Sequence, residues 1–251
     1  NIKWEEFDTF VRKTIDDQQD QTTRGIFAPW MLYKQDHFDI GGHDQRFTPF
    51  GYEDSDIFNR WILAGYEMVQ SRDALCYHLT CRGHRWNKGV GIENPDYESI
   101  MTRCRRDFIR KWGDWINNDG YQYPIINPKY EVGIVIENCT PQLLKALEPW
   151  CSYIYVDMEE FGVYSIKEQE NSSFNIDDRV KGFDPNKYVV KDNITVKING
   201  DKFTQQDFQT IQNFSAIIQD SGAIGEFELG NLKIQINDLT TYENQLIKNE
   251  R

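Results

Sequence analysis

An acidic cluster followed by a histidine is the group of residues in this chain whose types and spacing could do chemistry. Glu53, Asp54 and Asp56 stand within four positions of one another, and His78 follows. Transfer of a sugar from a nucleotide sugar needs a carboxylate that takes the acceptor hydroxyl proton, and a divalent cation that offsets the charge on the departing diphosphate. The cluster and the histidine could supply part of both requirements.

A helix is predicted to position the acids. It begins at Asp54 or Ser55, and Gly65 stands where a left-handed C-terminal cap is expected. Its apolar face is formed by Ile57, Phe58, Trp61 and Ile62. The carboxylates then lie at the helix N-terminus, where the helix dipole stabilises each acid by about 0.3 to 1 kcal/mol whatever its chemistry. The helix dipole would explain one acid at this position, but it is a weaker explanation for three acids within four positions.

Two short strands are predicted to bring His78 back alongside this helix start. They cover residues 66–70 and 75–80 and are separated by Ser71-Arg72-Asp73. A single histidine on a strand is more often a hydrogen-bonded core residue than a metal ligand. His78 becomes a candidate ligand only because of the acids that precede it.

The charge of the chain argues against a nucleic-acid partner. The formal net charge is -12 and the pI is about 4.8, so the whole surface would repel a phosphate backbone. Basic residues still gather between residues 82 and 111, where eight Lys and Arg face four acids. A small anionic ligand could bind there, although most of these side chains fit an ordinary solvated helix face.

The cysteines and the hydropathy pattern lead us to expect a cytoplasmic protein. The five cysteines match neither a disulfide framework nor a paired zinc motif, and Cys76 and Cys81 around His78 lack a second pair of ligands. No run of 18 apolar residues occurs, and residues 1–6 do not have the composition of a signal peptide. We therefore expect no membrane span.

The rest of the chain predicts an α/β fold with two domains. Residues 4–15 have close to helical spacing, and Asn94-Pro95 opens a helix that Gly113 closes. Further on, residues 130–137 and 152–157 are predicted strands that enclose a helix, and Gly230-Asn231 is a hairpin turn. Because glycine, asparagine and proline are frequent between residues 113 and 128, we place one domain at 1–127 and a smaller α/β domain at 128–251.

Three stretches around the acids carry a resemblance to a known family: Phe38-Asp39-Ile40-Gly41-Gly42-His43-Asp44-Gln45-Arg46-Phe47, residues 51–60 and Ala64-Gly65-Tyr66. The resemblance is to the acceptor-side half of GT-A glycosyltransferases. It is closest to the galactosyltransferase C-terminal segment and to the inverting family-2 enzymes, and it covers about residues 24 to 88. It implies a partial GT-A-like half that transfers a sugar, with galactose as one candidate, from a nucleotide-diphosphate sugar to a glycan acceptor.

The resemblance also implies a role for individual residues. It makes Asp54 the general base and His78 a ligand of Mn²⁺ or another divalent cation. Arg85 and its neighbour His84 would contact the donor diphosphate, because arginine offers paired donors to phosphate oxygens. The residues that would bind the acceptor are Glu53, Asp56, Gly41, Gly42 and Tyr52.

The nucleotide-binding half of such enzymes is expected before the resembling segment, yet only about 24 residues precede it here. We therefore expect a missing segment or a separate chain to supply the donor-binding half. The alternative is a rearranged donor site built on Asp157 and Glu159 in the second domain.

Two other functions remain open at this point. The chain could be a non-catalytic carbohydrate- or protein-binding module derived from a glycosyltransferase, with Trp30, Tyr52 or Trp86 stacking on sugar rings. It could also be a structural protein in which the acids only cap a helix.

Overall fold

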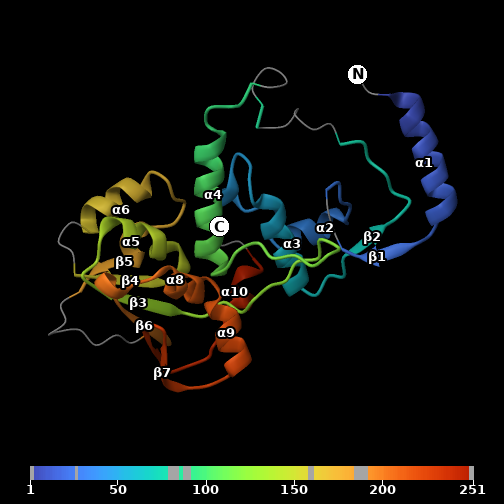
Figure 1. The fold of residues 1–251 in the computed structure, drawn as a ribbon. Helices are drawn as coiled ribbons and strands as arrows, with labels where there is room; N and C mark the ends of the chain where they lie inside the picture. Colours follow the sequence, from blue (N-terminus) through green and yellow to red (C-terminus); the bar gives the residue numbers. More distant parts are fainter. Residues whose placement is uncertain are drawn as a thin grey trace.

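Helices dominate the first half of the chain, and the strands of a large sheet come from the second half (Figure 1). The computed structural model describes residues 3–25, 28–78, 85–86, 92–157, 161–183 and 192–248. The mixed α/β class predicted from the sequence is confirmed, and a six-stranded sheet with helices is compatible with a GT-A-like fold. In the described part of the chain no helix is both long and apolar enough to cross a membrane.

The first half holds four α-helices, one short 3-10 helix and a small two-stranded ribbon among its described residues. In chain order the elements are α1 (Trp4–Gln18), β1 (Thr22–Arg24), α2 (Lys34–Asp39), η1 (Gln45–Phe47), α3 (Glu53–Leu63), β2 (Val69–Ser71) and α4 (Tyr97–Trp112). The predicted helices over α1, α3 and α4 are confirmed. Gly65 and Gly113 have φ angles of +85° and +75°, so both adopt the left-handed conformation expected after a helix.

Of the two strands predicted over residues 66–70 and 75–80, the first overlaps β2, and the second is absent from its described residues 75–78. β2 pairs in antiparallel fashion with β1, so its partner is the polar segment Thr22–Arg24 that comes before α2. Residues 75–78 form no regular secondary structure, and residues 79–80 lie outside the described part. Local alternation of apolar residues could not reveal this partner, because β1 is short and polar.

A six-stranded sheet organises the second half. Its strands are β3 (Val132–Glu137), β4 (Tyr153–Val156), β5 (Val180–Gly182), β6 (Ile194–Asn199), β7 (Gly225–Leu229) and β8 (Leu232–Ile236). They lie in the order β5-β4-β3-β6-β8-β7; the first four run parallel, and β8 and β7 complete an antiparallel edge. The predicted strand-helix-strand unit and the Gly230-Asn231 hairpin are both confirmed.

One face of this sheet carries the main hydrophobic core. Ile134 and Ile136 of β3 project to this face because alternate residues of a strand point the same way, and both are buried. The helices that cover it are α5 (Pro141–Leu147), α8 (Gln205–Gln212) and α9 (Phe214–Ser221), with Leu144 and Ile211 among their buried residues. Burial of each large aliphatic side chain contributes about 1.5–3 kcal/mol to folding.

Helix α4 joins the two halves through buried charges. It stands between α3 and the sheet half (Figure 1). Its Arg110 is fully buried and donates to Glu148 at 2.5 Å and to Asp107 at 2.8 Å. Glu148 opens the short η2 helix (Glu148–Trp150) and also accepts from Arg179 at 2.7 Å.

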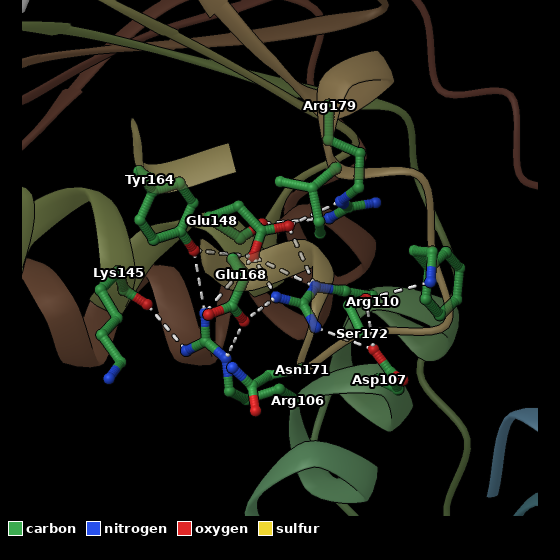
Figure 2. Close-up of polar contacts among 12 residues, drawn as sticks. Arg106, Asp107, Arg110, Lys145, Glu148, Tyr164, Glu168, Asn171, Ser172 and Arg179 are labelled. Atoms are coloured by element: carbon green, nitrogen blue, oxygen red, sulfur yellow. Dashed lines mark hydrogen bonds and ion pairs between the residues drawn. The ribbon is translucent and has the colours of Figure 1, made fainter. Parts of the chain in front are cut away.

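Figure 2 shows the guanidinium groups of Arg106 and Arg110 facing the carboxylates of Glu148 and Glu168. Glu168 belongs to α6 (Phe161–Gln169), and Arg179 closes α7 (Ile176–Arg179). The remaining described elements are η3 (Gly200–Lys202) and α10 (Glu243–Leu246). The ion pairs of this network cross residue 128, where we place the domain boundary, and the boundary itself stays a prediction.

The pKa of Glu148 reflects the strength of this network. Burial alone would raise it, but Arg179 and Arg110 outweigh the burial and hold the pKa at about 2. Removing one partner of a buried ion pair leaves an uncompensated charge and costs about 3–5 kcal/mol. Glu148 is therefore the residue on which we expect the attachment of α4 to the sheet half to depend most.

We predict that Glu148→Gln lowers the free energy of unfolding by about 3–5 kcal/mol, because the amide removes the buried charge that Arg110 and Arg179 share and leaves Arg110 only Asp107 and Glu168. Urea denaturation followed by tryptophan fluorescence measures this loss. Glu5→Gln on exposed α1 is the matched control and should change stability by less than about 0.5 kcal/mol. Equal effects of the two substitutions would contradict the prediction.

Acid should weaken the same attachment. The pKa of Glu148 is about 2 in the folded protein and 4.5 in its ordinary state, so between these values the unfolded chain binds a proton that the folded chain does not. Its contribution is complete above about pH 4.5 and is lost as the pH falls toward 2. Urea denaturation from about pH 6 to about pH 3 should show a loss of stability that is smaller in Glu148→Gln; an identical loss in both proteins would refute this assignment.

Candidate functional site

A tight turn delivers the acidic cluster at the start of α3. Gly51 and Tyr52 have φ angles of +100° and +71°, and the helix begins at the next residue. A Cβ on Gly51 would collide with the sulfur of Met101 on α4, so the turn is pressed against that helix. Glycine is the residue that tolerates both the angle and the close approach.

Glu53 and Asp54 keep their carboxylates unpaired. Both side chains are partly exposed in the first turn of α3, and the structure records no hydrogen bond or ion pair for either of them among the described residues. The helix dipole favours their negative charge. These two acids are therefore available to a ligand.

Asp56, for which we predict contact with the acceptor, has a different position from these two acids. Its side chain is fully buried, and its oxygens accept hydrogen bonds from Arg60 at 2.9 Å and from the indole of Trp112 at 3.0 Å. Lys111 forms an ion pair with it at 2.6 Å. A carboxylate enclosed by these three partners presents no oxygen to an acceptor hydroxyl.

Gly41 and Gly42 form the predicted backbone turn, and the interior of the protein holds it. Their φ angles are +82° and +69°, and the carbonyl of Gly42 accepts from Arg60 at 2.5 Å. Arg60 is fully buried and also donates to the carbonyl of Ile40 at 2.8 Å. The positive φ angles explain why glycine occupies both positions. Contact of the two glycines with an acceptor remains a prediction.

A buried charge cluster missed by the sequence reasoning fixes this region. Asp44 and Lys111 are both buried, and the ammonium of Lys111 donates to Asp44 at 2.7 Å. Burial raises the pKa of Asp44, but Lys111 outweighs the burial, and the net shift is downward. The i, i+4 spacing of Asp56 and Arg60 was a signal available in the sequence. The partner on α4 was not, because it lies 55 residues after Asp56.

His78 and the acids do not form one set of metal ligands in the described part of the structure. It is exposed and follows Tyr77, whose ring packs against Phe7 and Trp4 of α1 at centroid distances of 5.1 Å and 6.1 Å. Among the described residues, no group of three His, Cys, Asp or Glu side chains is placed to hold a metal ion. The structure therefore does not join His78 and the acids into the predicted cation site.

Two of the other predicted site residues do come together. Tyr52 and Arg85 line one hollow of about 300 Å³, with Tyr97 and Arg105 of α4 beside them. Arg85 pairs with Glu93 at 2.7 Å and is 53% exposed, so its guanidinium keeps a free side toward solvent. Burial raises the pKa of the Tyr52 hydroxyl, and nearby Arg105 acts against this rise. His84 and Glu159 lie outside the described residues.

Residues 19–82 match the family model described as the N-terminal domain of galactosyltransferase. No curated protein and no solved structure matches the chain. The match supports a galactosyltransferase-like glycosyltransferase and includes the Gly41-Gly42 turn, the acids and His78. Because the description names an N-terminal domain, the match does not support our assignment of the segment to a C-terminal half.

The structure predicts a division of roles between neighbouring acids. Asp56→Asn should lower the free energy of unfolding by about 3–5 kcal/mol, because it weakens a buried ion pair with Lys111 and Arg60. Asp54→Asn should cost about 0.3–1 kcal/mol, the usual helix-dipole contribution. Urea denaturation of both variants measures the difference, and a large loss in Asp54→Asn would show that Asp54 is structural.

Proposed function

We propose that this chain provides the acceptor-side part of a galactosyltransferase-like glycosyltransferase. It would transfer a sugar, with galactose as the first donor sugar to test, from a nucleotide-diphosphate sugar to a glycan acceptor. The match of residues 19–82 to a galactosyltransferase domain carries this proposal. The position of Asp54 supports the proposal. Its unpaired carboxylate lies in the first turn of α3, and the buried ion pair between Asp56 and Arg60 holds that helix in place.

Asp54 is the proposed general base. Its carboxylate would take the proton of the acceptor hydroxyl while the hydroxyl oxygen attacks the anomeric carbon of the donor sugar, and the nucleoside diphosphate leaves with the electron pair of the broken bond. Glu53, one residue earlier, would accept hydrogen bonds from other acceptor hydroxyls. Tyr52 would form a wall beside them.

Arg85 and Arg105 are the proposed contacts of the departing diphosphate. They line the same hollow as Tyr52, and a guanidinium can donate two hydrogen bonds at once to phosphate oxygens. Their positive charge would offset the charge that develops on the leaving group. The hollow is open and small, so it would hold only the diphosphate end of the donor. The remainder of the donor site is proposed to come from a separate chain or a further segment.

The described residues do not fit a divalent cation. His78 offers one imidazole without two further ligands close by, so no step of the proposal passes through a metal. The manganese dependence expected from the resemblance stays a prediction. Melting temperatures measured with MnCl₂ alone and with MnCl₂ plus a uridine diphosphate sugar address it directly.

A transfer assay tests the proposal. The protein is incubated with MnCl₂, radiolabelled UDP-galactose or UDP-glucose and a panel of oligosaccharide acceptors, and labelled glycan is counted. We expect transfer that Asp54→Asn lowers about 100-fold or more, since loss of a general base costs about 10² to 10⁴ in rate. Asp8→Asn, an exposed acid on α1, is the matched control and should keep the full rate. Transfer that is unchanged in Asp54→Asn would refute the role of Asp54.

A further inference from the structure

A hollow of about 670 Å³ opens at the C-terminal end of α3, away from the acids at its start. Its described walls come from Gly25, from residues 28–32, from Trp61, from residues 66–71, which include β2, and from Ala74 and Cys76. All of them fall inside the segment that matches the galactosyltransferase domain. The volume suits a small-molecule ligand, for which about 300–1,000 Å³ is usual.

Aromatic and apolar side chains form part of these walls. Trp30 and Trp61 meet edge to face, with ring centroids 4.9 Å apart and planes at 79°. Tyr66 stands near them, and Met31 lies at the hollow although 97% of it is exposed. An apolar side chain so exposed gains little from the fold itself, whereas a ligand would cover it.

Polar side chains form the rest. Glu67 and Gln70 line the hollow, and the structure records no side-chain hydrogen bond for either of them within the described residues. A saccharide has apolar C–H faces that stack on aromatic rings and hydroxyls at its rim that hydrogen-bond to polar groups. This mixture of walls therefore fits a saccharide better than a purely apolar molecule.

The indole of Trp61 supplies an independent observation. Trp61 is 4% exposed, and its Nε1 has no hydrogen-bond partner among the residues that the structure describes. A buried donor without an acceptor costs about 1–3 kcal/mol. Because Nε1 is closed to solvent, a sugar hydroxyl or ring oxygen could accept from this N–H, and recover that cost, only once the indole turns toward the hollow.

The hollow has a defined relation to Asp54. Asp54 and Trp61 are seven residues apart on α3, so they lie on the same side of the helix and about 10 Å apart along its axis. That separation exceeds one sugar ring. A glycan whose reacting hydroxyl lies at Asp54 would reach the hollow with a later residue of its chain.

We propose that this hollow is a second saccharide subsite, which binds the part of the acceptor glycan remote from the reacting hydroxyl. Trp30 would stack on a sugar ring, Glu67 and Gln70 would bind its hydroxyls, and Trp61 would donate to one of its oxygens once its indole turns toward the hollow. The proposal deepens the proposed function and rests on it for the identity of the ligand. It makes affinity depend on the length of the acceptor.

Binding of oligosaccharides of increasing length tests the subsite without any transfer. β1,4-linked galactose- and glucose-containing oligosaccharides of one to four residues are titrated into the protein by calorimetry. We expect the three- and four-residue probes to bind about tenfold or more tightly than the monosaccharides. Trp30→Ala should remove this gain, because a stacked ring contributes about 0.5–1.5 kcal/mol, up to about tenfold in affinity.

Two exposed wall residues keep the test valid if Trp30→Ala fails to fold. Met31→Ala and Glu67→Gln change side chains that the fold does not need, and each should reduce the gain with length at an unchanged melting temperature. Tyr33→Ala is the matched control, since Tyr33 is 83% exposed and is not part of the described wall. It should leave the gain intact.

The outcomes separate this subsite from the proposed reaction. Length-dependent binding that persists in Asp54→Asn and is lost in the wall variants would support the subsite whether or not transfer occurs. Transfer with no dependence on acceptor length, or with full dependence in Met31→Ala and Glu67→Gln, would overturn the subsite and leave the reaction standing. The subsite would also be overturned if the hollow bound a simple alkyl chain, such as a decyl group, and bound none of the oligosaccharides.

Discussion

Two neighbouring charged residues of α4, Arg110 and Lys111, connect this helix to two different parts of the protein. Arg110 turns toward Glu148 and its partners at the sheet, while Lys111 turns toward Asp44 and Asp56 beneath the start of α3. Successive residues of a helix point about 100° apart, so one helix can enter two buried clusters. Each cluster pays a desolvation cost that only its complete set of partners offsets. The position of α3 relative to the sheet therefore depends on charges that solvent does not reach.

This constraint explains why the acids at the start of α3 differ so much in environment. Asp56 meets Lys111 and Arg60 on the inward side of the helix, and Arg60 in turn holds the carbonyl of Gly42. The inward acid and the glycine turn are thus parts of one support. Asp54 precedes Asp56 by two residues, so its side chain is rotated by about 200° around the helix axis from that of Asp56 and takes no part in this support. A base held by such a support keeps its position without losing its own carboxylate to an ion pair.

The sequence predicted what is local and missed what is distant. The helices α3 and α4, the β3-α5-β4 unit and the Gly230-Asn231 hairpin followed from periodicity and end signals, and all appear in the structure. The two charge clusters did not follow, because a buried lysine and a solvated one look the same in a sequence. The pairing of β2 with β1 was not predicted for a related reason: a polar strand of three residues has no alternation to detect. His78 was expected on a strand, whereas residues 75–78 form no regular secondary structure, and its role as a metal ligand stays a prediction.

α3 also sets the scale of any acceptor that the chain can bind. It has eleven residues, with Asp54 in its first turn and Trp61 near its end, and six consecutive residues from Asp56 to Trp61 are buried. A helix fixed over its middle cannot shorten or swing one end without breaking the Arg60 contacts. The distance between the free carboxylate and the aromatic hollow is then a property of the backbone, not of flexible side chains. Recognition of a glycan along this helix would select for length as well as for the sugar at its end.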